Sequence, residues 1–155
     1  MSENKNIILS VKDLEVKFKV RDRVLTAIRH ISMDFEEGKV VAIVGESGSG
    51  KSVFTKTFTG MLEVNGEVSN GEIWFEGQDL AKIKKDSEWE KIRGKKIATV
   101  FQDPMTSLNP VKTIGDQISE VIIKHQGKSK SEAKKMAIEM MGKVGIKDPD
   151  KRYDE

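Results

Sequence analysis

The sequence predicts a mixed α/β fold that opens with antiparallel strands and ends with helices. Three observations carry this prediction. Apolar and polar residues alternate over 14–20, a continuous apolar run covers 40–44, and apolar residues recur at helical spacing after Pro110. A chain of 155 residues can bury one sizeable core, so we expect one domain.

The opening residues predict antiparallel β-structure. Alternation over 14–20 is typical of a half-buried strand, because successive side chains of a strand point to opposite faces. The sequence RDR at 21–23 predicts a turn, and Ile31, Met33 and Phe35 then alternate again before EEGK.

Two continuous apolar segments, 40–44 and 97–101, predict strands covered on both faces, as in a parallel sheet. Between them, apolar residues over 54–62 share one face of a helix, and turn glycines flank a short strand at 72–75. The segment SEWEKIRG at 87–94 suggests a short helix.

Two further helices are predicted after Pro110. Thr113 is the expected N-cap of the first, whose apolar face comprises Ile114, Ile118, Val121 and Ile122. Ser129 and Glu132 predict a capping box for the second, which we expect to stop at Gly145. Its expected apolar face comprises Ala133, Met136, Ala137, Met140, Met141 and Val144.

Composition excludes several classes of function. Lys+Arg 27 and Asp+Glu 25 give a net charge of +2 without a block of one sign, so no nucleic-acid partner is indicated. Cysteine is absent, which excludes disulfides and thiolate sites and agrees with a reducing cytosol. No stretch approaches the ~20 apolar residues of a membrane-spanning helix, and the N-terminus does not resemble a signal peptide. We therefore expect any membrane role to come through a partner.

The segment at 45–52 fits the pattern G-x-x-x-x-G-K-[ST], and it lies between a predicted strand and a predicted helix. Its residues are Gly45, Glu46, Ser47, Gly48, Ser49, Gly50, Lys51 and Ser52. Glycines let the backbone curl so that N–H groups point at phosphate oxygens, and the helix N-terminus adds partial positive charge. Lys51 is suited to the β- and γ-phosphates and Ser52 to Mg²⁺. The segment predicts ATP and Mg²⁺ as cofactors; the alternative is a flexible glycine-serine turn.

Gln102 directly follows the apolar segment 97–101, in the stretch VFQDPMTSLNP. A P-loop supplies one side-chain ligand to Mg²⁺, which takes six oxygens, so a second loop can supply another or hold a water beside the γ-phosphate. An amide carbonyl does this without adding negative charge beside ATP. The alternative is an exposed glutamine in a polar loop.

With both segments in view, the sequence resembles the nucleotide-binding subunits of ATP-binding-cassette (ABC) transporters. GESGSGKS is similar to that family's Walker A motif and VFQDP to its Q-loop, and KIATVFQDPMTSLNP is similar to oligopeptide and dipeptide importers, a group that includes nickel importers. The resemblance runs from about Ile7 onward. It implies a P-loop NTPase fold with an antiparallel β-subdomain over about 7–38, a P-loop core over 39–102, and a Q-loop and helical subdomain over 103–155.

The resemblance also implies roles for single residues. Gln102 would be the catalytic Q-loop glutamine, contacting Mg²⁺ or the attacking water. Phe18 lies where the family places an aromatic ring that stacks on adenine; tyrosine is common there, and strand alternation equally explains an inward core ring. Val53 would lie near the α-phosphate.

The resemblance further implies two motifs. One is a buried strand followed by Asp and a catalytic Glu, and the other is a signature of the LSGGQ type. The only Asp-Glu pair, Asp154-Glu155, follows a polar segment, and neither His30 nor His125 lies where the family's switch histidine belongs. We therefore expect a chain truncated before these motifs. It should bind nucleotide without hydrolysing it, and it should self-associate through uncovered sheet edges.

In that family such a subunit is peripheral at the cytoplasmic face of the membrane. Its partners would be permease subunits, reached through the Q-loop and helical subdomain, and a second ATP-binding subunit. A substrate-binding protein would act only indirectly. Three alternatives stay open: a nickel rather than a peptide importer, a non-transport ABC module acting on nucleic acid or the ribosome, and a P-loop kinase. A kinase needs arginine side chains to clamp its substrate, and Arg93 is the only arginine between the P-loop and Arg152. The kinase alternative is therefore the least favoured.

Overall fold

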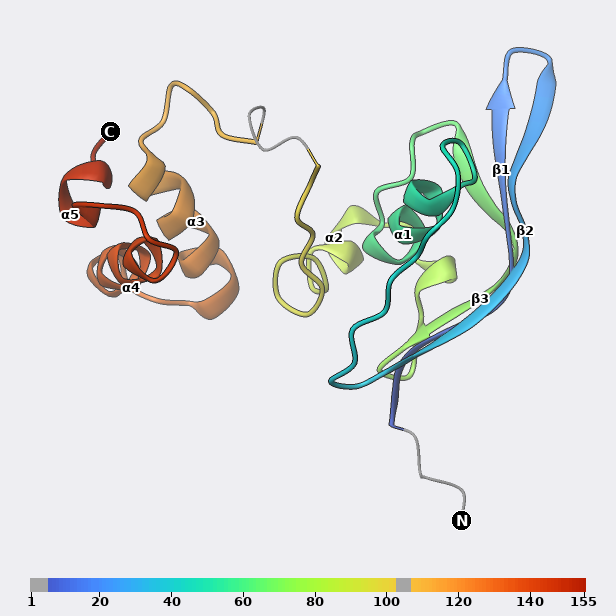
Figure 1. The fold of residues 1–155 in the computed structure, drawn as a ribbon, viewed down its shortest axis with the longest axis horizontal. Helices are drawn as coiled ribbons and strands as arrows, with labels where there is room; N and C mark the ends of the chain where they lie inside the picture. Colours follow the sequence, from blue (N-terminus) through green and yellow to red (C-terminus); the bar gives the residue numbers. More distant parts are fainter. Residues whose placement is uncertain (1–5, 103–106) are drawn as a thin grey trace. The chain divides into compact units, whose positions relative to one another are not determined.

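The structure, a computed structural model, describes residues 6–102 and 107–155 (Figure 1). The chain divides into two compact units, 1–91 and 92–155. The first unit contains a β-sheet and one longer helix, and the second is helical.

The sheet of the first unit has four antiparallel strands in the order β2-β1-β3-β4. Strands β1 (Ile7–Val20) and β2 (Arg23–Glu36) form a long hairpin; β3 (Gly66–Phe75) pairs with the other side of β1, and β4 (Gln78–Asp79) completes the sheet. The predicted antiparallel opening is confirmed. The short strand predicted at 72–75 is the end of β3, which joins the same sheet from later in the chain.

A bulge in β1 keeps the apolar residues of this strand on one face. Leu9 and Val11 are buried at odd positions, whereas Leu14 and Val16 are buried at even positions. The register shifts between Val11 and Leu14 in the pairing with β2, and between Lys12 and Glu15 in the pairing with β3. One extra residue reverses the alternation of a strand, so the bulge is what lets both pairs of side chains enter a single core.

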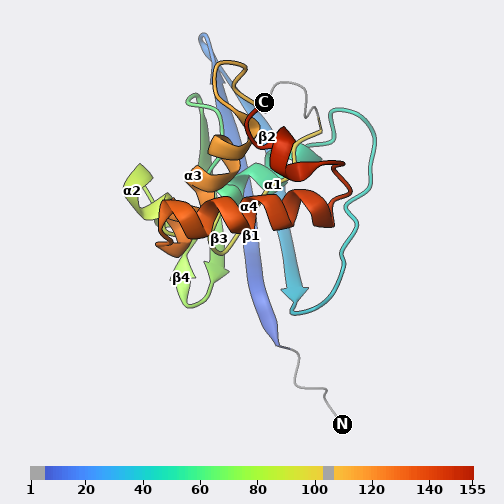
Figure 2. The same ribbon diagram turned by 90° about the vertical axis from the view of Figure 1, so that its left-hand side faces the viewer.

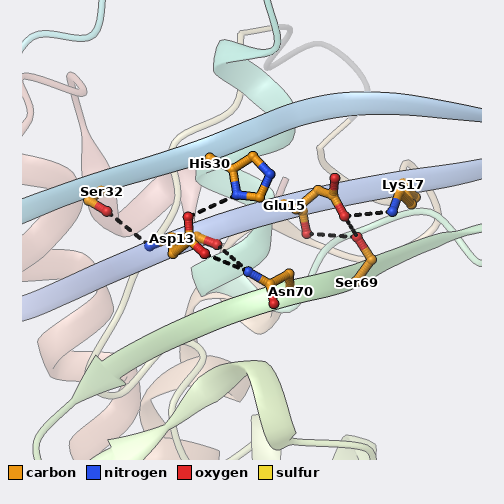
Figure 3. Close-up of polar contacts among 7 residues, drawn as sticks. All are labelled: Asp13, Glu15, Lys17, His30, Ser32, Ser69 and Asn70. Carbon is orange, nitrogen blue, oxygen red and sulfur yellow. Dashed lines mark hydrogen bonds and ion pairs between the residues drawn. The ribbon is translucent and has the colours of Figure 1, made fainter.

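Asp13 ties this bulge to both neighbouring strands (Figure 3). Its carboxylate lies 2.9 Å from His30 Nδ1 on β2 and accepts a hydrogen bond from Asn70 Nδ2 on β3 at 2.8 Å. Asp13 has φ +48 and His30 has φ +52, conformations in which short polar side chains are tolerated. Gly71 has φ +96, and a Cβ there would lie 2.5 Å from the Asp13 carbonyl oxygen, so only glycine fits. His30 is exposed, as predicted for a surface histidine.

Helix α1 (Lys51–Thr59) packs on the sheet through aromatic side chains. Phe35 of β2 has its ring centroid 6.5 Å from that of Phe54 and 5.8 Å from that of Phe58. The helix predicted after the glycine loop is confirmed, and Gly60 ends it in the left-handed conformation. The unit is completed by a 3₁₀ turn, η1 (Leu80–Lys82), and by α2 (Asp86–Trp89), which is shorter than the helix suggested at 87–94.

The two predicted parallel strands are not formed in the described residues. Segment 40–44 has no regular secondary structure, and Val40 and Val44 are 100% and 86% exposed. Val100 is 99% exposed, and segment 97–101 contributes only an isolated bridge between Arg93 and Ile97. A parallel strand requires neighbours on its edges and layers over its faces, and neither segment has them among the described residues. The apolar runs are therefore strand-forming sequence without partners.

The second unit consists of α3 (Ile114–Gln126), α4 (Lys130–Lys143) and the short α5 (Pro149–Arg152), which Figure 2 shows gathered together. The predicted caps are confirmed. Thr113 Oγ1 accepts a hydrogen bond from the Asp116 N–H, and Ser129 and Glu132 form the capping box. Within the part of the chain that is described, no helix is long and apolar enough to cross a membrane.

The core of the helical unit is built from both long helices and from one aromatic residue beyond them. It comprises Ile122, Ala133, Ala137 and Tyr153. The predicted apolar face of α4 is wrong at its last turns, because Met140 and Val144 are 50% and 72% exposed. Helix α4 ends at Lys143, with Val144 as its C-cap, so Val144 lies outside the helical face.

We predict that Asp79 stabilises the first unit in a pH-dependent way. Burial raises its pKa, but hydrogen bonds from the Ile73 N–H, Lys82 and the Ala81 N–H together lower the pKa below its ordinary value of 3.8. Asp79→Ala leaves the Ile73 N–H without its acceptor and should cost about 1–3 kcal/mol of unfolding free energy near pH 7. Both tryptophans, Trp74 and Trp89, lie in this unit, so urea unfolding followed by tryptophan fluorescence measures it.

Because the folded-state pKa is lowered, this stabilisation is present above the unfolded-state pKa and is lost as the pH falls through the folded-state value. The difference between wild type and Asp79→Ala should therefore shrink below about pH 4. Glu67→Ala, at an exposed carboxylate on β3, is the matched control. An equal effect from both substitutions would contradict the assignment.

Candidate phosphate-binding site

The glycine loop lies between β2 and α1 in the first unit. Gly48 has φ +81 and Gly50 has φ +91, and Gly50 is the N-cap of α1. These left-handed conformations strain any residue with a Cβ, which explains why glycines are needed at both positions. The loop therefore delivers Lys51 as the first residue of the helix.

The Lys51 side chain turns back into its own loop. Its ammonium Nζ donates hydrogen bonds to the Gly45 carbonyl at 2.8 Å and to the Glu46 carbonyl at 2.7 Å, and it lies 3.4 Å from Ser49 Oγ. The loop also closes on itself through the Ser49 N–H, which donates to the Glu46 carbonyl at 3.2 Å. The structure thus brings Gly45, Glu46, Ser49 and Lys51 together within one loop.

The start of α1 offers unpaired donors for an anion. The first N–H groups of a helix have no intrahelical acceptor, and those of α1 belong to Lys51, Ser52 and Val53. Gly50 has no side chain with which to cap them, and no acidic residue stands in the first turn. An added Cβ at Gly48 would meet nothing within 4 Å, so the backbone there is open to approach. This donor set fits a phosphate group.

The glycine loop packs against strand β2 at Gly50. An added Cβ at Gly50 would lie 2.8 Å from Ile28 Cδ1 and 3.0 Å from the Ala27 carbonyl oxygen, so the Gly50 backbone rests directly on the strand. A cavity of about 270 Å³ adjoins this contact, and its walls include Ile28, Met33, Phe54 and the loop itself. The loop is therefore seated on the antiparallel sheet.

Three other predicted site residues, Ser47, Ser52 and Val53, belong to the loop and the first turn of α1, whereas Phe18 belongs to β1. Ser47 and Ser52 are exposed, and Val53 is half-buried in the first turn of α1. Phe18 is a half-buried residue of β1 that pairs with Gly66, and its ring would contact any Cβ added there, at 2.5 Å. Phe18 is not among the residues that line the cavity beside the loop.

Gln102 belongs to the second unit, where it is exposed in a segment without regular secondary structure. Residues 103–106 of the stretch VFQDPMTSLNP, on which the resemblance to the Q-loop partly rests, lie outside the described residues. His125 is half-buried at the end of α3, and the space at Gly94 is limited by its Nε2 atom. Among the residues that the structure describes, no group of His, Cys, Asp and Glu could hold a metal ion.

A model of the ABC transporter family matches residues 28–155, which include the whole glycine loop and α1. The chain belongs to the ABC transporter family.

Curated relatives within this family have names that agree with one another. The chain is 61% identical over 155 residues to the oligopeptide transport ATP-binding protein AmiE of Streptococcus pneumoniae, covering all of this chain and 44% of that relative. It is 50% identical to the dipeptide transport ATP-binding protein DppD of Lactococcus lactis, covering 96% of this chain and 42% of the relative. The chain thus spans less than half the length of these ABC proteins.

Solved structures of ABC cassettes resemble the chain as well. A dimeric structure of the bacterial ABC transporter cassette MJ0796 has a TM-score of 0.77 and 26% identity, covering 95% of this chain and 60% of that one. A post-hydrolysis state of MJ0796 bound to ADP and Pi has a TM-score of 0.71, covering 86% and 57%. The P-loop NTPase fold class is thus confirmed for the ABC chain.

Sequence reasoning overlooked two residues of the helical unit. Gln117 and Tyr153 each hold neighbouring backbone in place through several contacts. Gln117 sits on an exposed side of a helical pattern and Tyr153 follows a charged segment, so neither produces a periodic signal. Only the rarity of tyrosine, with one in the chain, could have drawn attention to Tyr153.

We predict that Gly50→Ala loosens the glycine loop more than Gly48→Ala does. Both substitutions place a Cβ at positive φ, but only the one at Gly50 collides with β2. The common backbone strain should cost about 1 kcal/mol, and the collision should add about 1–3 kcal/mol. Amide hydrogen exchange over 45–54 measures the loosening directly. Equal exchange in the two variants would show that the loop does not rest on β2.

Proposed function

We propose that this chain is the ATP-binding part of an ABC importer for peptides, and that it binds ATP with Mg²⁺ without turning it over. The observation that carries the proposal is the glycine loop, with its unpaired helix N–H groups and an inward ammonium at Lys51. Oligopeptide and dipeptide transport in the names of the relatives supports the cargo class.

In this proposal the loop backbone and the N–H groups of Lys51, Ser52 and Val53 hold the phosphates. Lys51 exchanges its carbonyl partners for the β- and γ-phosphate oxygens, which are stronger acceptors because they are charged. The Ser52 hydroxyl, exposed at the start of α1, is placed to hold Mg²⁺. Mg²⁺, when bound, neutralises phosphate charge.

Gln102 would provide the second neutral oxygen for the metal or orient water, and the Phe18 ring would stack on the adenine. Both roles rest on the resemblance and on residue chemistry. The half-buried Phe18 ring lies against Gly66 and fills the space that a side chain there would take.

The carboxylates within these 155 residues support the proposed absence of turnover. The pair Asp154-Glu155 does not follow a buried strand; it follows α5, and the Glu155 carbonyl accepts a hydrogen bond from the Ile114 N–H. It is therefore unsuited to act as the Asp and catalytic Glu that the family places after a buried strand. A permease partner at the cytoplasmic face of the membrane, and a second ATP-binding subunit, are the assembly we propose by analogy with the dimeric cassettes.

Titration calorimetry with ATP and Mg²⁺ tests the proposal. Wild type should bind, and Lys51→Ala should weaken binding by at least about tenfold because it removes a charge-assisted contact to phosphate. Gln102→Ala should make binding less sensitive to Mg²⁺. Phe18→Ala should weaken ATP binding while leaving inorganic triphosphate binding unchanged, because only ATP carries the ring that stacks.

Lys91→Ala is the matched control for loss of one positive charge elsewhere in the first unit, and it should bind as wild type does. Absence of Mg-ATP binding by the wild-type chain would overturn the proposal. Steady hydrolysis that disappears with Lys51→Ala would overturn its claim of catalytic incompleteness.

A further inference from the structure

The Gln117 side chain fastens the loop that leads into α3, which the ion pair between Lys112 and Glu120 also joins to this helix. Gln117 Oε1 accepts a hydrogen bond from the Asn109 N–H at 2.8 Å. Its Nε2 group donates to the carbonyls of Asn109 and Lys112, both at 3.1 Å, and lies 3.3 Å from that of Thr113. One amide thus satisfies backbone groups along the loop, which fixes the loop against the first turns of α3.

The backbone of residues 153–155 is fastened to the same end of α3. The Gly115 N–H donates to the Tyr153 carbonyl at 2.9 Å, and the Ile114 N–H donates to the Glu155 carbonyl at 2.8 Å. These are N–H groups that a helix start leaves without intrahelical partners. Residues 153–155 therefore cap α3 from a distance of about forty positions in the sequence.

The Tyr153 side chain secures this cap. It is buried, and its hydroxyl lies 2.8 Å from the buried Ser119 Oγ. Its ring leaves no room at Gly115, where an added Cβ would lie 2.2 Å from Tyr153 Cγ. Lys134 of α4 lies over the ring, with Nζ 4.4 Å from the centroid, and also pairs with Asp154. Contacts from α3 and α4 thus converge on one tyrosine.

We infer that Tyr153 and Gln117 are positioning residues that join the loop before α3 to the segment 153–155, so that a displacement of either one moves the other. Both fastenings fall within residues 114–119, which span about one and a half turns of one helix. So short a stretch of helix is stiff between its contacts. The loop before α3 and the segment 153–155 are therefore attached to the same rigid part of α3. We call residues 114–119 the α3 joint.

The inference gives the α3 joint a role in the proposed function and rests on it in that respect. The described residues of this loop, 107–113, come soon after Gln102 in the sequence, and Gln102 is the residue proposed to respond to nucleotide. The α3 joint would pass a movement of this loop to residues 153–155. The coupling itself is a property of the helical unit, so it can be tested without nucleotide.

Amide hydrogen exchange of the nucleotide-free chain tests the coupling in both directions. Tyr153→Phe removes only the hydroxyl contact to Ser119 and should raise exchange at Ile114 and Gly115 by about two- to tenfold, the effect of losing one hydrogen bond. It should also raise exchange at Val111 and Lys112, whose N–H groups donate to Asn109 in the loop. Gln117→Met should raise exchange at Ile114 and Gly115 in return, because coupling is reciprocal.

Gly115→Ala, which expels the Tyr153 ring, should give a larger effect of the same kind, and Gly142→Ala is its control because an added Cβ in α4 meets nothing within 4 Å. Exchange within α4 should stay as in wild type, which separates the joint from general loosening. Exchange that rises at Ile114 and Gly115 while Val111 and Lys112 stay unchanged would overturn the inference, as would a uniform rise across α4. Neither outcome depends on nucleotide binding.

Discussion

The contact of Gly50 with strand β2 is the constraint on which the geometry of the glycine loop, the proposed phosphate site, depends. It is possible only because the Gly50 backbone approaches the Ala27 carbonyl and Ile28 without a Cβ between them. The contact fixes the end of the glycine loop, and with it the direction in which α1 presents its first N–H groups. Strand β2 is in turn positioned by the β1 bulge, where Asp13 joins three strands. The glycine loop is thus seated on the antiparallel sheet, and no parallel sheet surrounds it among the described residues.

The inward position of Lys51 links this geometry to binding. An ammonium that bonds two loop carbonyls keeps the loop curled and keeps the charge where phosphate would arrive. Phosphate then competes with neutral carbonyls for the same cation, a competition that favours the charged acceptor. In the helical unit, two side chains, Gln117 and Tyr153, likewise hold segments of backbone against helix α3.

The sequence was informative wherever structure depends on neighbours along the chain. The caps at Thr113 and Ser129, the helix after Gly50 and the hairpin of β1 and β2 are all local, and all are confirmed. The strands expected at 40–44 and 97–101 depend on partners elsewhere, and the described chain supplies none. Tyr153 and Ser119 meet across 34 positions, a distance over which no periodicity operates. The glycine loop was predictable because a phosphate nest imposes its own residue types, whereas the roles of Phe18 and Gln102 remain proposals.

We propose that the glycine loop, seated on the antiparallel sheet, binds phosphate without help from further strands. The most direct measurement is the amide NMR spectrum of the chain during titration with inorganic triphosphate. We expect the amide signals of Gly48, Gly50, Lys51, Ser52 and Val53 to shift in a saturable way. The amide signals of β1 and β3 should not shift. If the sheet is folded and the amides of the glycine loop show no saturable shift, the proposal is wrong, because the N–H donors would then be present without forming a phosphate site.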